Sequence, residues 1–261
     1  TARRQLMLCA QFLKHVDADT PLRFLIAEVE APATVMGAIY LARLYGVDHR
    51  LDISPLFETP DAIERGGRFV ERLLEEDEFV DYVRKRGRIS IQCGYSDSGR
   101  FMGQIAADLA IERLHILISR ALAARNIRDI EVVIFNTHGE SMGRGGHPGD
   151  FDARLDHLFT PWARARFQRD GIKVNAECSF QGGDGFLHFQ TPALAEATMR
   201  AVFAWSRRAV ERPDADRFYS DINFSWDVYR TIKSWQEALF ANPHYQAALS
   251  AFAPNFLPST G

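Results

Sequence analysis

The feature that most constrains this chain is an alternation of strand-like and helix-like segments that recurs five times. Short runs rich in β-branched and other apolar residues are each followed by a loop and a longer helical pattern, and they cover 23–29, 51–57, 89–93, 130–135 and 172–176. Strand, loop and helix in regular succession predict a parallel sheet with its helices packed outside, and therefore an α/β fold.

Five strands do not complete an eight-stranded barrel. The sheet is therefore either open or the latter part of a barrel whose first strands lie upstream. Helical patterns follow the strands over about 33–45, 60–86, 102–125 and 151–169. Beyond Thr191 the sequence reads as helix only, over 193–210, 221–240 and 243–252. We expect two parts, a partial (β/α) barrel over residues 1–190 and a helical extension over 191–261 that packs on it.

Composition excludes several classes of protein. The formal net charge of −3, with 25% charged residues, argues against a nucleic-acid binder, which normally carries a basic stripe. No apolar run approaches the ~20 residues that span a bilayer, so we expect no membrane partner. The three cysteines form no disulfide or zinc pattern, which favours the cytoplasm. Neither end looks like a natural terminus, so we expect a portion of a longer protein.

Two carboxylates follow neighbouring strands of the expected sheet. Glu58 comes directly after the second strand, and Asp97 follows the third. Together they would form an oxygen-rich site suited to Mg²⁺ or Mn²⁺. Each also has a simpler interpretation: Glu58 as an acid near a helix start that Thr59 caps, and Asp97 as a neighbour of a capping Ser96 or Ser98.

The loop after the fourth strand is rich in glycine. Five glycines lie between Gly139 and Gly149, and Arg144 lies among them. Glycine frees backbone N–H groups to approach an anion, and a guanidinium can hold a phosphate or carboxylate with two hydrogen bonds. His138 and His147 could bind a metal or move a proton, although loop histidines are more often simply solvated. The loop 179–185, after the fifth strand, is a turn close to a ligand or a flexible hairpin.

Taken in order, these motifs resemble the phosphoenolpyruvate carboxylase family. The family's PLFET stands at 55–59 and its GYSDS at 94–98. The GRGG of its glycine loop stands at 143–146 with Pro148 after it, and Gln181-Gly182 matches part of its TEQGE. Asp227-Val228-Tyr229-Arg230 fits a helical region of the family. The resemblance runs from about Leu22 to the end of the chain.

The resemblance implies a fold and a set of residue roles. The fold would be part of a (β/α)₈ TIM-type barrel with additional C-terminal helices. Glu58 and Asp97 would bind Mg²⁺ or Mn²⁺. The residues implied in catalysis are Arg144, Arg100 and His138. Those implied in the substrate or anion-binding loops are Gly143, Gly145, Gly146 and Gln181.

The implied reaction is carboxylation of phosphoenolpyruvate with bicarbonate to oxaloacetate and phosphate. In the family mechanism bicarbonate attacks the phosphorus, and the resulting carboxyphosphate releases carbon dioxide that the pyruvate enolate captures. The implied partners are these two substrates and further copies of the chain in a homo-tetramer.

Several family positions are altered. Asn136 and His138 stand where the family has a histidine and an arginine, Phe101 replaces an acidic residue, and Phe180 replaces the glutamate of TEQGE. Three interpretations follow: an active carboxylase seen in part, a non-catalytic relative that binds a metal or anionic ligand without turnover, and a different metal-dependent barrel enzyme such as an aldolase. The ordered pair of PLFET and GYSDS disfavours the third.

Overall fold

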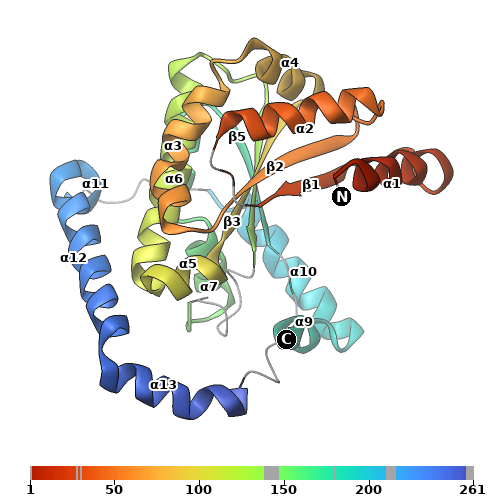
Figure 1. Cartoon of the computed structure of the whole chain (residues 1–261). Helices are drawn as coiled ribbons and strands as arrows, with labels where there is room; N and C mark the ends of the chain where they lie inside the picture. Colours follow the sequence, from red (N-terminus) through yellow and green to blue (C-terminus); the bar gives the residue numbers. More distant parts are fainter. Residues whose placement is uncertain are drawn as a thin grey trace.

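The structure is a computed structural model that describes residues 2–27, 29, 31–137, 147–178, 180, 182–209 and 216–256 (Figure 1). Five strands form one sheet. Their bounds are β1 (Leu22–Ile26), β2 (Leu51–Phe57), β3 (Arg88–Gly94), β4 (Glu131–Thr137) and β5 (Lys173–Cys178).

Helices precede, separate and follow these strands. Those up to the fifth strand are α1 (Ala2–His15), α2 (Pro32–Leu44), α3 (Pro60–Leu73), α4 (Asp77–Arg86), α5 (Tyr95–Met102), α6 (Gln104–Ala124), α7 (Phe151–Leu158) and α8 (Pro161–Asp170). Those after it are α9 (Gly182–Phe189), α10 (Pro192–Arg207), α11 (Arg217–Ser220), α12 (Ile222–Ala241) and α13 (Pro243–Phe256). The alternation read from the sequence is therefore confirmed as an α/β fold.

All neighbouring strands pair in parallel, in the order β1-β2-β3-β4-β5. The sheet therefore grows in one direction along the chain, without the reversal of strand order that marks doubly wound sheets. The carboxyl ends of all five strands consequently lie at one edge.

One face of the sheet is apolar and packs on helices. Ile53, Phe57, Ile91 and Ile134 are buried on it, and Phe57 meets Phe69 of α3 edge to face, with ring centroids 5.6 Å apart. Helices α3, α6 and α8 form a layer over this face, in which α6 contacts both of the others. Figure 1 shows α3 and α6 side by side. Alternation along each strand sends the next residue to the opposite face.

The opposite face is polar, although much of it is also buried. Ser54 and Ser90 are buried with their Oγ atoms 3.2 Å apart. Asp52 accepts hydrogen bonds from Arg86 at 2.7 Å and lies 2.9 Å from Arg88. Paired charges and hydrogen bonds offset the cost of removing these groups from water.

The sheet is strongly curved toward its polar face. Arg23 on β1 forms an ion pair with Glu177 on β5, and its guanidinium lies 4.8 Å from the ring centre of Phe135 on β4. In a flat sheet the outer two strands would be about 19 Å apart, four spacings of about 4.8 Å, which is beyond the reach of an Arg–Glu pair. The two edge strands therefore face each other across a concave interior.

Several helix boundaries differ from those expected. The single pattern over 60–86 is two helices, α3 and α4, and that over 151–169 is also two, α7 and α8. Thr160 accepts a hydrogen bond from Ala163 N and Pro161 follows it, which starts a new helix rather than continuing the old one. The structure also adds α1, for which no element was expected.

Two segments read as loops are helical. The GYSDS motif begins α5, where the hydroxyl of Ser98 donates to the carbonyl of Gly94 within the helix, so neither serine caps it. The second is the start of α9 (Gly182–Phe189), since a turn or hairpin was expected over 179–185. The first segment contains glycine and serine and the second is rich in glycine, so the local composition of both favours loops.

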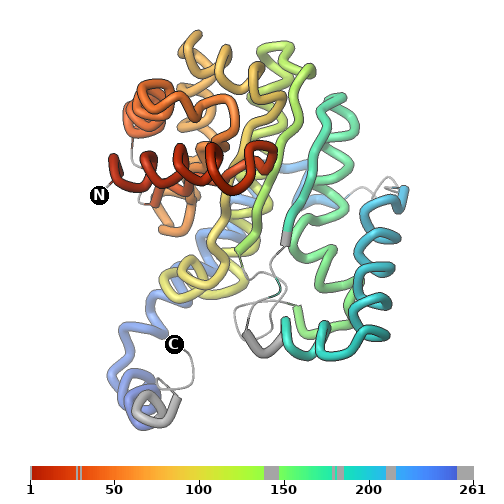
Figure 2. The backbone as a smooth tube through the Cα atoms, turned by 90° about the vertical axis from the view of Figure 1, so that its right-hand side faces the viewer, coloured from red at the N-terminus to blue at the C-terminus, as the bar shows by residue number. Residues whose placement is uncertain are grey.

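The residues after Thr191 are helical in the described ranges, as the sequence predicts. Figure 2 shows them as two arms, with α10 on one side and α12 with α13 on the other. Trp205 of α10 donates to Asp156 of α7 at 2.8 Å, and Tyr229 of α12 donates to Glu64 of α3 at 2.6 Å. No described helix has the length and apolar character needed to cross a membrane.

Candidate functional site at the carboxyl edge of the sheet

The ends of β2 and β3 place two short motifs side by side. Parallel pairing sets Phe57 opposite Cys93, so Glu58 emerges beside Gly94. Thr59 then accepts a hydrogen bond from Ala62 N at 3.2 Å and Pro60 opens α3, as the sequence predicts. This cap ends the strand sharply and fixes where Glu58 leaves it.

Gly94 lets Glu58 approach the neighbouring strand. A Cβ atom at this position would lie 2.8 Å from Cβ of Glu58, closer than two such carbons can approach. The backbone of Gly94 has an ordinary negative φ, so the requirement is one of space and not of conformation. Any larger residue would displace Glu58.

Asp97 lies in the first turn of α5, directly after β3. Its carboxylate is 43% exposed and lies 3.0 Å from a guanidinium nitrogen of Arg100, one turn along the helix. Glu58 and Asp97 line the same cavity, of about 230 Å³, and Arg100 lines it with them. The structure thus brings together these three sequence-predicted residues.

A glutamine that sequence reasoning did not single out also lines this cavity. Gln92 of β3 is only 4% exposed, and its Nε2 donates to Oγ1 of Thr137 at the end of β4. Its Oε1 has no hydrogen-bond partner among the described residues. A buried amide oxygen without a partner is costly, so this one points to a ligand or ordered water in the cavity. The available sequence signal was a polar residue inside an apolar strand.

The cavity suits a hard divalent cation. Glu58, Asp97 and Gln92 offer oxygen donors, the type that Mg²⁺ and Mn²⁺ prefer. The described residues hold no cluster of three or more His, Cys, Asp and Glu side chains that could enclose a metal. A cation held by two carboxylates would keep several coordination positions for water or substrate, as Mg²⁺ commonly does.

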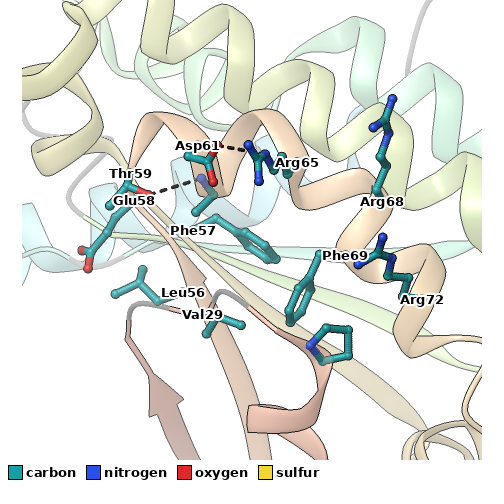
Figure 3. Close-up of a pocket in the computed structure, with 12 residues that line it drawn as sticks. Val29, Leu56, Phe57, Glu58, Thr59, Asp61, Arg65, Arg68, Phe69 and Arg72 are labelled. Carbon is teal, nitrogen blue, oxygen red and sulfur yellow. Dashed lines mark hydrogen bonds and ion pairs between the residues drawn. The ribbon is translucent and has the colours of Figure 1, made fainter.

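A larger cavity of about 950 Å³ opens on the other side of Glu58 (Figure 3). Its lining includes Phe57 and Phe69, with Arg65, Arg68 and Arg72 of α3. Arg65 pairs with Asp61 at 2.8 Å, and the Glu58 carboxylate extends away from that pair in Figure 3. Glu58 therefore stands between a carboxylate-lined cavity and an arginine-lined one.

The predicted loop residues lie outside the described residues. These are His138, Gly143, Arg144, Gly145, Gly146 and Gln181. His147 is described, and its Nδ1 accepts a hydrogen bond from Gly149 N at 2.9 Å. That bond fits a role in shaping the loop.

Two of the altered family positions are built into the fold. Asn136 is fully buried and donates from Nδ2 to the carbonyl of Leu158 at the end of α7, at 3.0 Å. Phe180 belongs to an aromatic cluster with Phe151, His188 and Phe189, at centroid distances from 5.1 to 6.0 Å. Both side chains therefore make contacts within the fold, although Oδ1 of Asn136 has no hydrogen-bond partner among the described residues.

Cys93 and His115 form a second pair of chemically capable groups, on the helix-covered face. Their Sγ and Nε2 atoms are 3.7 Å apart. Burial raises the pKa of Cys93 to about 12 and lowers the pKa of His115 to about 3. Both groups are therefore neutral at neutral pH, which removes the thiolate that a nucleophile or metal ligand needs.

Comparisons with known proteins agree with the two motifs. A family model described as phosphoenolpyruvate carboxylase matches residues 6–153, which include Glu58, Asp97 and Arg100. The phosphoenolpyruvate carboxylase of Aeromonas hydrophila is 30% identical over 146 residues, covering 56% of this chain and 16% of that protein.

Other relatives show the same pattern. The phosphoenolpyruvate carboxylase of Chromohalobacter salexigens is 33% identical over 126 residues, covering 48% of this chain and 14% of that protein. Phosphoenolpyruvate carboxylase 1 of Zea mays is 30% identical over 138 residues, covering 51% of this chain and 14% of that protein. The matches to these three relatives cover only 14–16% of the length of each relative. The match to the family model covers more than half of this chain. The chain belongs to the phosphoenolpyruvate carboxylase family.

Proposed function

We propose that this chain forms part of the active site of an enzyme that carboxylates phosphoenolpyruvate with bicarbonate, giving oxaloacetate and phosphate. The observation that carries the proposal is the cavity shared by Glu58, directly after β2, and Asp97, in the first turn of α5 after β3, with the unpartnered Oε1 of Gln92 beside them. Family membership supports the choice of substrates.

The cation of the proposal is Mg²⁺ or Mn²⁺, which Glu58 and Asp97 would hold, with Gln92 in the lining of the same cavity. When bound, such an ion supplies positive charge that stabilises negative charge developing on substrate oxygens. Two protein carboxylates leave room for phosphate and carboxylate oxygens of a substrate at the same centre.

The chain's own residues would bind and orient the substrates. Arg100 already lies 3.0 Å from Asp97, so a cation arriving at Asp97 would compete for that carboxylate and free the guanidinium for an anion. In the proposal Arg144 and the glycines of its loop, Gly143, Gly145 and Gly146, hold phosphate or bicarbonate. His138 and Gln181 complete the anion site.

The curved sheet supports a place in an eight-stranded barrel. In such a barrel the first and fifth of the eight strands are diametrically opposite, and interior side chains meet across the axis. The Arg23–Glu177 pair joins β1 to β5 in this way. We propose that residues 1–190 are part of a (β/α)₈ barrel, that 191–261 form a helical extension on it, and that the whole protein is a cytoplasmic homo-tetramer.

A second function is favoured by one observation. Asn136 stands where the family has a histidine, and its hydrogen bond to Leu158 directs it toward α7. A neutral amide held there cannot exchange protons with a substrate. A relative that binds a metal and an anionic ligand without turnover is therefore the alternative, and activity is the property that separates the two.

The cation site can be tested on this chain. We expect Asp97→Asn to weaken Mn²⁺ binding at least about tenfold, because a coordinating carboxylate is lost. The electron paramagnetic resonance signal of free Mn²⁺ measures binding directly. Asp61→Asn is the matched control, since Asp61 is an exposed carboxylate nearby that pairs with Arg65 and does not line the cavity. Equal binding by both variants would remove the cation site from the proposal.

The reaction can be tested on the full-length parent protein. Oxaloacetate formed from phosphoenolpyruvate and bicarbonate, with Mg²⁺, is followed by coupling to malate dehydrogenase and NADH. Bicarbonate-dependent turnover that Asp97→Asn abolishes would support the carboxylase. Mn²⁺ binding without any turnover would support the non-catalytic relative instead.

A further inference from the structure

A third cavity lies among the outer helices, apart from the carboxyl edge of the sheet. It has a volume of about 600 Å³ and is enclosed by α3, α6, α8, α11 and α12. Part of its wall is apolar, from Leu109, Ile116, Leu117 and Ile222. A space of this size accommodates a small organic molecule rather than a single ion.

The acidic side chains of this cavity are already engaged. Glu64 accepts hydrogen bonds from Lys233 and Tyr229, both at 2.6 Å. Although burial opposes its ionisation, these bonds hold the pKa of Glu64 below its usual value. Glu112 accepts hydrogen bonds from Tyr219 to both of its oxygens, at 2.7 Å each. Glu64 therefore already compensates Lys233 and, in part, Arg113.

The basic side chains exceed the acidic ones. Four arginines line the cavity, and Arg166 pairs with Asp170 at 2.6 Å. Arg68, Arg113 and Arg120 have no carboxylate within ion-pair distance in the part of the chain that the structure describes. Arg113 is half-buried, and burial lowers its pKa; Tyr229 and the charge of Glu64 act in the opposite direction, and the neighbouring charge of Arg68 lowers the pKa further. A partly desolvated cation beside another cation is unfavourable unless an anion compensates both.

Arg113 is held in a geometry that leaves its N–H groups available. Its guanidinium lies over the ring of Trp226, 4.5 Å from the ring centre. Stacking uses the face of the guanidinium and leaves the N–H groups in its plane free to point at a ligand. The stack therefore preorganises a donor for an oxyanion, at the boundary between the polar and apolar walls.

Arg68 adds a second donor from the facing helix. It lines both the large cavity of Figure 3 and this one, and in Figure 3 it extends away from Phe69 rather than over it. The positive charges thus come from α3 and α6, and the aromatic and apolar groups come mainly from α6 and α12.

We propose that this cavity binds a small organic anion, with its phosphate or carboxylate group between Arg68, Arg113 and Arg120 and its apolar body against Trp226 and Ile222. The ligand would touch α3, α6 and α12 at once and so fasten the α12 arm to the helix layer. The site is separate from the carboxyl edge and needs no divalent cation.

The probe is phenyl phosphate, titrated into the chain by calorimetry in the presence of EDTA. We expect it to bind more tightly than inorganic phosphate or phenol alone. Only phenyl phosphate has both a phosphate group for the arginines and a ring for the apolar part of the cavity. Arg113→Gln and Arg120→Gln should each weaken its binding about tenfold, because each removes a charge-assisted hydrogen bond. The guanidinium over Trp226 is that of Arg113, so the Arg120 variant tests the site even if Arg113→Gln loosens α12.

Arg72→Gln is the matched control. Arg72 is an exposed arginine on α3 that lines the cavity of Figure 3 and not this one. Unchanged binding by Arg72→Gln, together with the losses in the other two variants, supports the site. Equal weakening by all three variants would show general attraction to a basic surface and overturn it, as would unchanged binding in both Arg113→Gln and Arg120→Gln.

Discussion

The two faces of the sheet are both largely buried, yet they are built from opposite chemistry. On the outer face Phe57, Ile91 and Ile134 pack on helices α3, α6 and α8. On the concave face Asp52, Ser54, Ser90 and Gln92 are buried as well, and ion pairs or hydrogen bonds hold them.

This difference separates the residues that stabilise the fold from those that prepare a site. The outer face gains stability from removing apolar surface from water, which needs no particular orientation of the side chains. The concave face gains little from burial, and its polar groups must each find a partner. On this face Asp52 has ion-pair partners for both of its oxygens, Arg86 and Arg88. Oε1 of Gln92 has no partner among the described residues, and Gln92 lines the same cavity as Glu58 and Asp97.

The largest loss of stability should come from a substitution on the outer face. Phe57→Ala removes a buried ring that contacts Phe69, and we expect it to lower the free energy of unfolding by about 3–5 kcal/mol. Urea denaturation followed by circular dichroism measures the change. Phe101→Ala, at a ring that is 56% exposed, should change it by no more than about 0.5 kcal/mol. Similar losses in both variants would contradict the assignment of the core to this face.

The second largest loss of stability should come from removing a paired charge on the concave face. Asp52→Asn leaves Arg86 and Arg88 without their carboxylate, and we expect a loss of about 3 kcal/mol in the free energy of unfolding. Asp19→Asn is the control, because Asp19 pairs with Arg50 on the surface and its loss should cost less than about 1 kcal/mol. An unchanged midpoint for Asp52→Asn in urea would mean that the pair contributes only to specificity.

A half-buried carboxylate among the helices should make stability depend on pH. Asp108 has His157 Nε2 at 3.5 Å, and burial, helped by the charge of Glu112, raises the pKa of Asp108 to about 8. The folded state therefore keeps a proton that the unfolded state loses above a pH of about 4, so this contribution to stability is lost as the pH rises toward 8.

Asp108→Asn should remove that dependence. Relative to the wild type, the variant should gain about 2 kcal/mol in free energy of unfolding between pH 5 and pH 8, a value reduced from the full linkage because Asp108 is partly exposed. Urea denaturation at several pH values gives the two curves. Curves that stay parallel would show that Asp108 is ionised in the folded state throughout.

The smallest effect on stability should accompany a clear effect on binding. Gln92→Met removes the unpartnered Oε1, so we expect the free energy of unfolding to change by less than about 1 kcal/mol. Mn²⁺ binding should weaken about tenfold, because the amide oxygen that would orient a ligand or water beside the cation is lost. Ser90→Ala, one layer deeper on the same strand and face, should leave Mn²⁺ binding unchanged. Unchanged binding in Gln92→Met would separate this residue from the site.

The sequence predicted the fold where local pattern and burial agree. The apolar runs gave all five strands, and Thr59 with Pro60 gave the start of α3. The break between α7 and α8 was missed, although Thr160 and Pro161 provide a cap and a helix start, because the surrounding helical pattern runs on through them. Helix α5 was missed because glycine and serine favour loops when tertiary contacts are unknown.

The candidate site was predicted only in part, for a related reason. Glu58, Asp97 and Arg100 lie beside recognisable motifs, and their approach follows from neighbouring parallel strands. Gln92 lies within a strand, and its environment depends on Thr137, which is 45 residues away. Contacts of that kind depend on how the sheet curves, which the pattern of a single strand does not contain.

The Arg23–Glu177 pair joins residues that are 154 positions apart. A contact that closes so long a loop gains nothing until the intervening β–α units have formed, and loops of this length close late. The pair should therefore report the last stage of folding, when curvature is set. The pair joins side chains only, so β1 and β5 remain the edges of the sheet after it forms, and their backbone groups are where a further strand could be added.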